Sequence, residues 1–199
     1  MELEDSDHEC RRIDVALPGV REFQIAFEQA VPDLPAMELS ALVAAGAPWS
    51  QMVELVEKRA PYGFLVYYRS DVHRLLKAAG DAADCILYLM GNHTIAERMF
   101  RHDPRVMLYA PMQAVMWEDQ AGKAWFTVDL PSAQLASFDV PEIAAVGREL
   151  DRKLAALLDA LNLEVPTVLA TTDTRVLPRH NRLDGSVPPL RSRPGEFDP

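Results

Sequence analysis

The chain has 199 residues, of which 49% are hydrophobic and 25% charged, and a formal net charge of −10. These values are typical of a soluble globular protein with one sizeable core or two small ones, and they exclude collagen-like, disulfide-scaffold and wholly disordered chains. Half of the net charge lies in the first ten residues, which contain neither Lys nor Arg. A mildly acidic body has no positive field for phosphate backbones or anionic lipid, so we expect neither nucleic-acid nor membrane partners.

The two cysteines, Cys10 and Cys85, have no CxxC spacing, and no secretory leader accompanies them. No apolar run approaches the roughly 18 residues needed to span a bilayer. We therefore expect a cytoplasmic protein with reduced thiols and no disulfide between the two cysteines.

Helix and strand patterns alternate in the first half of the chain. Apolar residues at helical spacing predict an amphipathic helix over 20–31. The apolar density of 37–45 predicts a strand, and 48–59 predicts a helix that must end before Pro61. The aromatic and β-branched run 63–69 predicts the next strand.

The middle of the chain continues this alternation. Residues 72–79 predict a short helix with Gly80 as its left-handed cap. The apolar run 85–90 predicts a buried strand. A capping box, in which Thr94 and Glu97 bond free backbone N–H groups, predicts the start of the helix that follows.

Three further strands and a long helix complete the expected domain. The strands are at 106–109, 112–118 and 123–129, and Gly122 supplies a positive φ in the hairpin loop between the last two. Asp139 is the expected N-cap of a helix of about six turns, whose apolar stripe needs a sheet face to cover. The stripe consists of Ile143, Val146, Leu150, Leu154, Leu157, Leu158 and Leu161. This order of elements favours an α+β fold, a two-layer sandwich of a mostly antiparallel sheet with helices packed on one face.

Composition changes at both ends of this pattern. Residues 1–36 are expected to form an N-terminal extension with one amphipathic helix, and residues 37–161 a single α+β domain. The segment 162–199 has six prolines and no helix or strand periodicity, which predicts a largely unstructured Pro/Arg-containing tail. The tail is either a partner-binding arm or a solvated extension.

An ordered set of short motifs resembles a known family. The motifs are Tyr62-Gly63-Phe64, Asp71, Gly91-Asn92, Met99, Pro104, Pro111, Trp117-Glu118-Asp119, Gly122-Lys123-Ala124-Trp125 and Pro131. Over 37–161 the chain resembles the domain of unknown function 302 family, which implies a small α+β domain whose antiparallel sheet is covered by helices. The family has no established activity, so the resemblance implies no catalytic roles. The chain departs from the family's pattern at His93, where proline is common, and at Leu130, where aspartate is common.

The segment Gly91-Asn92-His93 lies where a predicted strand passes into a predicted helix. Such junctions collect ligand-binding groups, because free N–H donors at a helix start attract anions. One interpretation is a ligand site in which His93 is a proton donor or charged anchor. The other is a tight turn in which Asn92 caps the helix. Cys85 and Met90 on the preceding strand complete the candidate ligand-binding set.

The other chemical candidates are weaker. Cys85, His93, His102 and Asp103 match no metal-ligand spacing, so we expect neither a metal nor a cofactor. A cysteine within an apolar strand has a raised thiol pKa, which disfavours Cys85 as a nucleophile. The sequence contains no P-loop, dinucleotide fingerprint or nucleophile elbow.

Methionine and tryptophan suggest binding surfaces instead. Five methionines fall between positions 90 and 116, either as core filling or as the lining of a pocket for a hydrophobic ligand. Trp117 and Trp125 are expected to face each other across the hairpin. If that sheet face is exposed, the pair marks a homodimer or partner interface.

These observations favour a small-ligand-binding or protein-interaction domain without catalysis. We expect a homodimer formed through the hairpin sheet, and a small hydrophobic or anionic ligand. The alternative is a small enzyme or metal-dependent protein that uses the Gly91-Asn92-His93 junction. The alternative requires Asn92, His93 and a second titratable group to converge on one open cleft.

Overall fold

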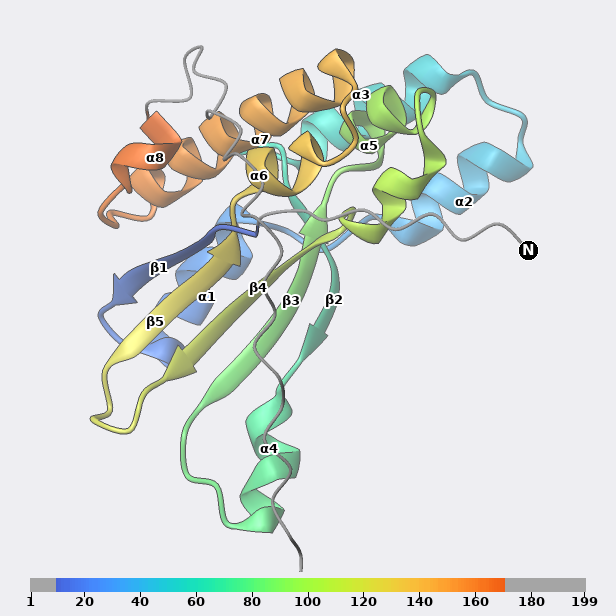
Figure 1. Cartoon of the computed structure of the whole chain (residues 1–199). Coiled ribbons are helices and arrows are strands. Elements are labelled where there is room, and N and C mark those ends of the chain that lie inside the picture. Colours follow the sequence, from blue (N-terminus) through green and yellow to red (C-terminus); the bar gives the residue numbers. More distant parts are fainter. Residues whose placement is uncertain (1–9, 171–199) are drawn as a thin grey trace, which may run out of the picture.

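The computed structural model describes residues 10–170, which form one five-stranded sheet with helices packed against one of its faces (Figure 1). The strands are β1 (Arg12–Leu17), β2 (Leu65–Ser70), β3 (Cys85–Gly91), β4 (Met112–Glu118) and β5 (Ala124–Asp129). Every pairing is antiparallel, in the order β1-β5-β4-β3-β2. The expected α+β class and antiparallel sheet are therefore confirmed.

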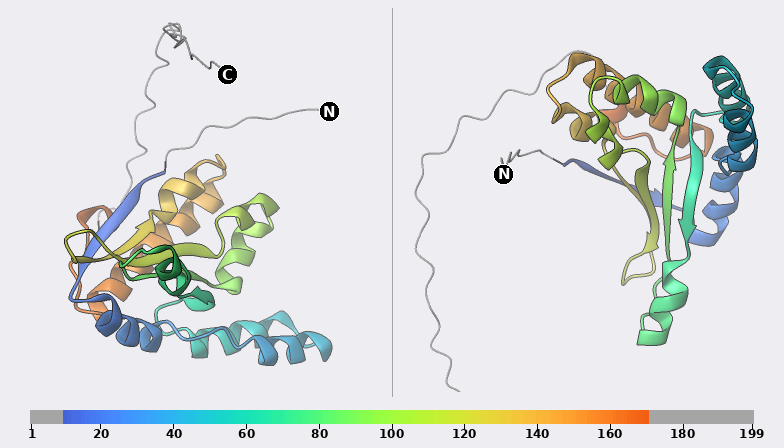
Figure 2. Two further views of the ribbon diagram at one scale, coloured as in Figure 1. Left: turned by 90° about the horizontal axis from the view of Figure 1, so that it is seen from below. Right: turned by 90° about the vertical axis from the view of Figure 1, so that its right-hand side faces the viewer.

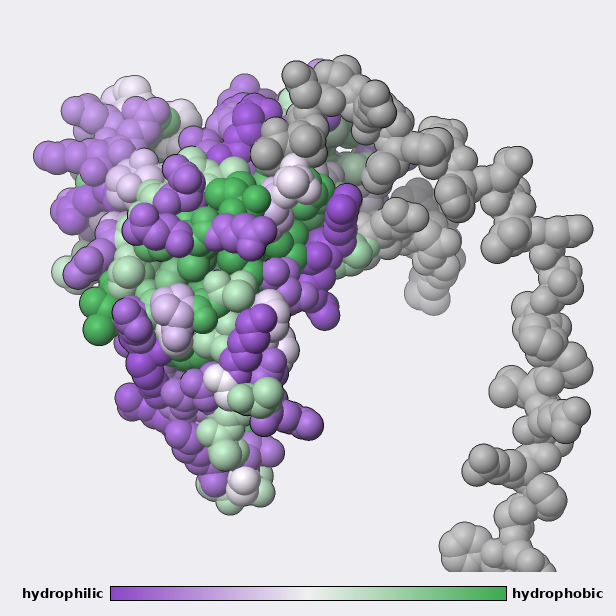
Figure 3. All heavy atoms as spheres, turned by 90° about the vertical axis from the view of Figure 1, so that its left-hand side faces the viewer, coloured by the Kyte–Doolittle hydropathy of each residue, from purple (hydrophilic) through white to green (hydrophobic). Residues whose placement is uncertain are grey.

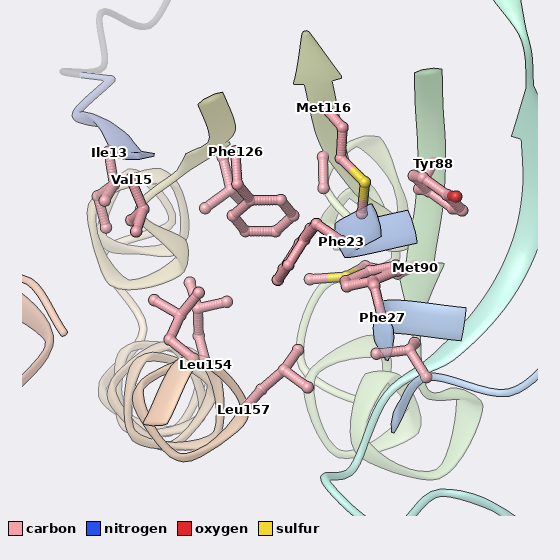
Figure 4. Close-up of a cluster of buried hydrophobic side chains, with 14 of the residues drawn as sticks. Ile13, Val15, Phe23, Phe27, Tyr88, Met90, Met116, Phe126, Leu154 and Leu157 are labelled. Carbon is pink, nitrogen blue, oxygen red and sulfur yellow. The ribbon is translucent and has the colours of Figure 1, made fainter. Parts of the chain in front are cut away.

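One face of the sheet is apolar, because alternate residues of a strand point to the same side. Helices α1 (Val20–Ala30) and α7 (Pro141–Ala160) cover this face. Figure 4 shows Phe23 and Phe27 of α1 and Leu154 of α7 gathered near Phe126 of β5. The Phe27 ring lies 5.0 Å from the ring of Tyr88 and 5.8 Å from that of Phe126, so α1 and the sheet share one aromatic core.

The remaining helices lie at the two ends of the sheet and beside β2. They are α2 (Ala36–Ala44), α3 (Trp49–Arg59), α4 (Val72–Leu76), α5 (His93–Phe100), α6 (Pro131–Ala136) and α8 (Thr167–Ala170), with the 3-10 helices η1 (Lys77–Ala79) and η2 (Pro104–Leu108). Helices α5 and α6 pack with η2 and the first half of α7 in a second apolar cluster. Helix α3 packs against β2 in a third cluster, and α4 extends from the opposite end of the sheet (Figure 1).

The second face of the sheet, which we call the open face, carries no helix within residues 10–170 (Figure 2). Seen from the side of β1, the molecule has a hydrophobic area in its middle, bordered by hydrophilic residues (Figure 3). No helix in the described part of the chain is both long and apolar enough to cross a membrane.

Two of the predicted strands are wrong. Residues 37–45 lie in and just after α2, because Ala, Leu, Met and Glu dominate this segment and favour helix. Residues 106–109 lie in and just after η2, which Pro104 begins and Asp103 caps by accepting the Arg105 N–H at 2.8 Å. The other predicted strands and the helices over 20–31 and 48–59 are present, within two residues of their expected bounds. The helix predicted over 72–79 is divided into α4 and the 3-10 helix η1.

Two predicted helix caps are also wrong. Asn92, not Thr94, caps α5, because its amide oxygen reaches the N–H groups of both Thr94 and Ile95, at 2.9 and 3.4 Å. The Glu97 carboxylate pairs instead with Arg101 at 2.6 Å. Helix α7 has Val140 as its N-cap, and Asp139 lies one residue earlier at a φ of 53°.

The core extends beyond the segment 37–161. Within 1–36, β1 pairs with β5, and α1 contributes Phe23 and Phe27 to the main core. Within 162–199, α8 places Leu169 in the same core at 1% exposure. The acidic residues 1–9 and the expected tail from 171 to 199 lie outside the described residues.

Candidate functional site

An apolar pocket of about 370 Å³ lies between the α2–α3 pair and α5, with η2 beside it. We call it the α3–α5 pocket. Its walls are Leu39, Val43, Trp49, Met52, Val56, His93, Thr94, Ala96, Glu97, Phe100 and Met107. Trp49, Phe100 and Met107 are 45%, 48% and 43% exposed, although each is large and apolar. Large apolar side chains gathered around a concavity are typical of a binding site rather than of bare surface.

Two helices build this pocket, each with residues of one helix face. Helix α3 contributes Trp49, Met52 and Val56, at positions i, i+3 and i+7. Helix α5 contributes Ala96 and Phe100 among its apolar wall residues. Residues at this spacing share one helix face, so each helix presents an apolar stripe to the space between them.

His93 supplies an imidazole to the wall of the pocket. Its ring lies 4.8 Å from the ring of Tyr67, edge to face at 64°. Burial beside such neighbours lowers the His93 pKa, so the imidazole is neutral at pH 7. The ring is only partly buried, and among the described residues its nitrogens have no hydrogen-bond partner. A neutral imidazole can donate one hydrogen bond and accept another, which suits a ligand with one polar group.

Asn92 has a structural role at the same junction. Its amide oxygen caps α5, and its amide nitrogen donates to the Gly63 carbonyl at 3.1 Å. The backbone of His93 is hydrogen-bonded to the Tyr67 hydroxyl, which opposes the increase in the Tyr67 pKa that burial causes. The first-turn N–H groups of α5 are therefore occupied, and an anion has few free donors there.

Replacing Asn92 with alanine is expected to lower the free energy of unfolding by about 1–2 kcal/mol, because two α5 N–H groups lose their acceptor. Asn92→Ser keeps an acceptor at the cap but loses the bond to Gly63, so it should retain most of the stability. Urea denaturation at pH 7 measures both variants. Equal losses for serine and alanine would show that the cap contributes little.

A second cavity, of about 30 Å³, lies behind Asn92 and is lined in part by Met90, Met99 and Met112. This volume holds about one water molecule and no larger ligand. Met90, Met99, Met112 and Met116 are 0–8% exposed and fill the interior. Of the five methionines between positions 90 and 116, Met107 is the one on the wall of the α3–α5 pocket.

Cys85 lies at the other end of β3 from His93, half-buried on the open face. Burial raises its thiol pKa, and Cys10 and Cys85 are both free. The structure therefore places Asn92 and Met90 at the small cavity, His93 in the α3–α5 pocket, and Cys85 apart from both. In the described part of the chain, no three His, Cys, Asp or Glu side chains are grouped to hold a metal ion.

Trp117 and Trp125 are directly opposite each other in the β4–β5 register, as expected, and half-buried on the open face. The Trp117 indole N–H donates to the Thr127 hydroxyl at 2.8 Å. That of Trp125 donates to Asp119 at 3.0 Å, and the Lys123 ammonium lies 3.9 Å from the centre of the Trp125 ring. Both indoles are thus oriented by the hairpin itself.

His73 is a buried polar residue that no sequence motif singled out. It is 2% exposed, its Nδ1 lies 3.1 Å from the Cys85 carbonyl, and its Nε2 lies 2.5 Å from an Arg21 nitrogen. Arg21 and Lys77 also pair with Asp84, at 3.2 and 3.3 Å. These contacts attach α4 and η1 to α1 and β3, and they occupy the polar atoms that a ligand would need.

These features define an α+β protein with an antiparallel sheet, one open sheet face and an apolar side pocket. The chain belongs to the DUF302 family: the model of the domain of unknown function DUF302 matches residues 43–161. The crystal structure of an uncharacterized conserved DUF302 protein from Bacillus stearothermophilus has a similar fold. The two align with a TM-score of 0.52 and 17% identity, over 76% of this chain and 97% of that chain. No curated protein matches this chain.

Proposed function

We propose that this protein binds a small, mainly hydrophobic molecule in the α3–α5 pocket and catalyses no reaction on it. The main support is the pocket itself, which is about 370 Å³ in volume, has nearly all-apolar walls, and is bordered by exposed Trp49, Phe100 and Met107. Small-molecule sites have volumes of about 300–1,000 Å³ and largely apolar linings with few polar groups.

The charges around the pocket favour a neutral ligand over an anionic one. The lining of the pocket contains one carboxylate, that of Glu97, and neither Lys nor Arg, so it offers an anion no cationic side chain to pair with. His93 is neutral at pH 7, and Asn92 occupies two N–H groups of the first α5 turn. A hydrophobic ligand with a single hydroxyl or carbonyl group, bonded to the His93 ring, fits this arrangement best.

The positions of the candidate catalytic groups support binding over catalysis. General acid–base chemistry needs two titratable groups within hydrogen-bonding reach of the same reacting atoms. Asn92 is held in the α5 cap, and Cys85 lies at the far end of β3. Glu97 shares the pocket wall with His93, but Arg101 holds its carboxylate at 2.6 Å.

Binding of N-phenyl-1-naphthylamine, a neutral hydrophobic fluorophore, tests this proposal. We expect saturable binding with one site per chain, weakened about tenfold by Phe100→Ala, because the loss of aromatic contact area costs roughly 1.5 kcal/mol. Trp49→Ala is expected to act in the same direction. Ile25→Ala is the control, since Ile25 is 65% exposed on α1 and lies outside the pocket.

Two results would overturn the proposal. One is fluorescence that rises without saturation, which indicates non-specific adsorption to apolar surface. The other is equal affinity in Phe100→Ala, Trp49→Ala and the Ile25→Ala control. Native mass spectrometry of protein purified from its own host then gives the mass of any retained ligand.

A further inference from the structure

The open face of the sheet is apolar at its centre, which is unusual for a solvated sheet face. Antiparallel sheets with one wet face alternate polar and apolar residues, so that polar side chains point to water. Here the open-face positions of the three central strands are mostly apolar. They include Cys85, Leu87 and Leu89 on β3, Val115 and Trp117 on β4, and Trp125 on β5, all half-buried.

The indole and hydroxyl groups at the centre of this face are satisfied within the chain. Both indole N–H groups have acceptors, Thr127 for Trp117 and Asp119 for Trp125. The Thr127 hydroxyl in turn donates to Asp14 on β1 at 2.5 Å. The centre of the face therefore consists of ring and aliphatic surface. A partner that covers this centre removes few unpaired polar groups from water, so the free-energy cost of desolvation is small.

We infer that a second copy of this chain covers the open face, in a symmetric face-to-face dimer. Two packed sheets place their inner faces about 10 Å apart, with strands nearly aligned. In this chain β4 is the middle strand of five, so a two-fold axis parallel to β4 divides the face evenly. Val115 and Trp117 then meet their own counterparts.

The polar edges of the face fit this symmetry. A two-fold axis along β4 places β1 of one copy opposite β2 of the other. The exposed Asp14 carboxylate on β1 thereby approaches Ser70 on β2, because the strand register places both residues level with Val115, and the Ser70 hydroxyl can donate to it. Like charges on β1 are kept apart, because the two β1 strands lie at opposite edges of the interface.

The area of the open face is close to the minimum for a specific dimer. Five strands about 4.8 Å apart and roughly six residues long, at about 3.3 Å per residue, cover about 500 Å² on each copy. Together the two copies bury about 1,000 Å², which is the lower bound for a specific interface. The α3–α5 pocket shares no residue with this face, so the dimer is independent of the proposed ligand site.

The mass of the full-length protein in solution tests the dimer directly. We expect light scattering after size exclusion to give twice the 22.2 kDa chain mass for the wild type at 100 µM. Val115→Glu places a charge at the centre of the interface and is expected to give the monomer mass. Ile25→Glu is the matched control on α1, 65% exposed, and should remain dimeric. A monomeric wild type, or a dimer that Val115→Glu leaves intact, would overturn the inference.

Cysteine alkylation tests whether a second copy or the chain's own residues 171–199 cover the open face. It uses the unsubstituted protein, so the result does not depend on whether a variant folds. Cys85 lies on the open face, whereas Cys10 is exposed before β1. If a second copy covers the face, the alkylation rate of Cys85 falls at least tenfold between 1 and 100 µM protein, while that of N-acetylcysteine added to the same samples is unchanged. A Cys85 rate that does not change with concentration would contradict the dimer.

Discussion

A fragment spanning residues 37–161 is expected not to fold cooperatively, although the whole DUF302 match, 43–161, lies within it. The fragment lacks β1, which forms six residue pairs with β5. It also lacks α1, whose Phe23 and Phe27 cover the centre of the sheet. Without them the apolar face of β5 and part of that of β4 would be exposed to water, and the edge of β5 would be unpaired. Circular dichroism and urea denaturation of this fragment and of residues 10–170 provide the comparison.

The same reasoning predicts the effect of one side chain in the full protein. Phe27 is 0% exposed and contacts both Phe126 and Tyr88, so Phe27→Ala should lower the free energy of unfolding by about 3–5 kcal/mol. Ile25→Ala, two residues away and 65% exposed, should change it by less than about 0.5 kcal/mol. If the two substitutions lower the free energy of unfolding equally, or if the fragment 37–161 unfolds cooperatively, α1 is an accessory rather than part of the core.

The fold was predictable from sequence where the apolar periodicity of a segment agrees with the turn and helix-stop residues at its ends. The strands at 85–90 and 112–118 are apolar runs bounded by turn signals, and the helix over 48–59 has both an apolar stripe and a proline stop. Strand β1 was not predicted, although it has a clear alternation, with Ile13, Val15 and Leu17 buried between exposed neighbours. Its partner β5 is more than 100 positions away, and a short alternating segment does not specify such a partner.

The misassigned segment 37–45 shows why the candidate site was harder to predict than the fold. Its apolar density suggested a strand that the core would bury, yet α2 has no fully buried residue. Met37 and Val43 are 87% and 66% exposed, and Leu39 and Val43 line the α3–α5 pocket. Apolar residues of a core and of a binding wall have the same helical spacing, so sequence periodicity alone does not distinguish them.

The junction at His93 was predictable, but its neighbours were not. A strand followed by Gly91-Asn92-His93 and a helix indicated a place where side chains reach solvent. The same motif did not reveal that Asn92 is held by Gly63 and that α3 supplies the opposite wall with Trp49. Both facts depend on segments at least 29 residues away in the sequence, which only the tertiary fold brings together.

Gly147 is the position at which helix α7 is most sensitive to an added side chain. A Cβ there would lie 2.9 Å from the Ser132 Cα and 3.3 Å from the Leu135 Cβ, both on α6. Helix α6 cannot easily withdraw, because the Ser132 N–H donates to the fully buried Asp151 at 3.0 Å, one turn further along α7. The close approach of two backbones, rather than any special φ, is therefore what requires glycine in the middle of this helix.

Replacing Gly147 with valine is expected to lower the free energy of unfolding by about 3 kcal/mol, and replacing it with alanine by about 1–2 kcal/mol, as overpacking pushes α6 from α7. Helix propensity alone predicts the opposite sign for alanine, a gain of about 1 kcal/mol. Ala145→Gly, at an exposed position two residues earlier, is the control and should lose about 1 kcal/mol through propensity only. Urea denaturation of the three variants decides between the two effects. A more stable Gly147→Ala protein would mean that α6 moves freely, and that the Ser132–Asp151 bond does not fix its distance from α7.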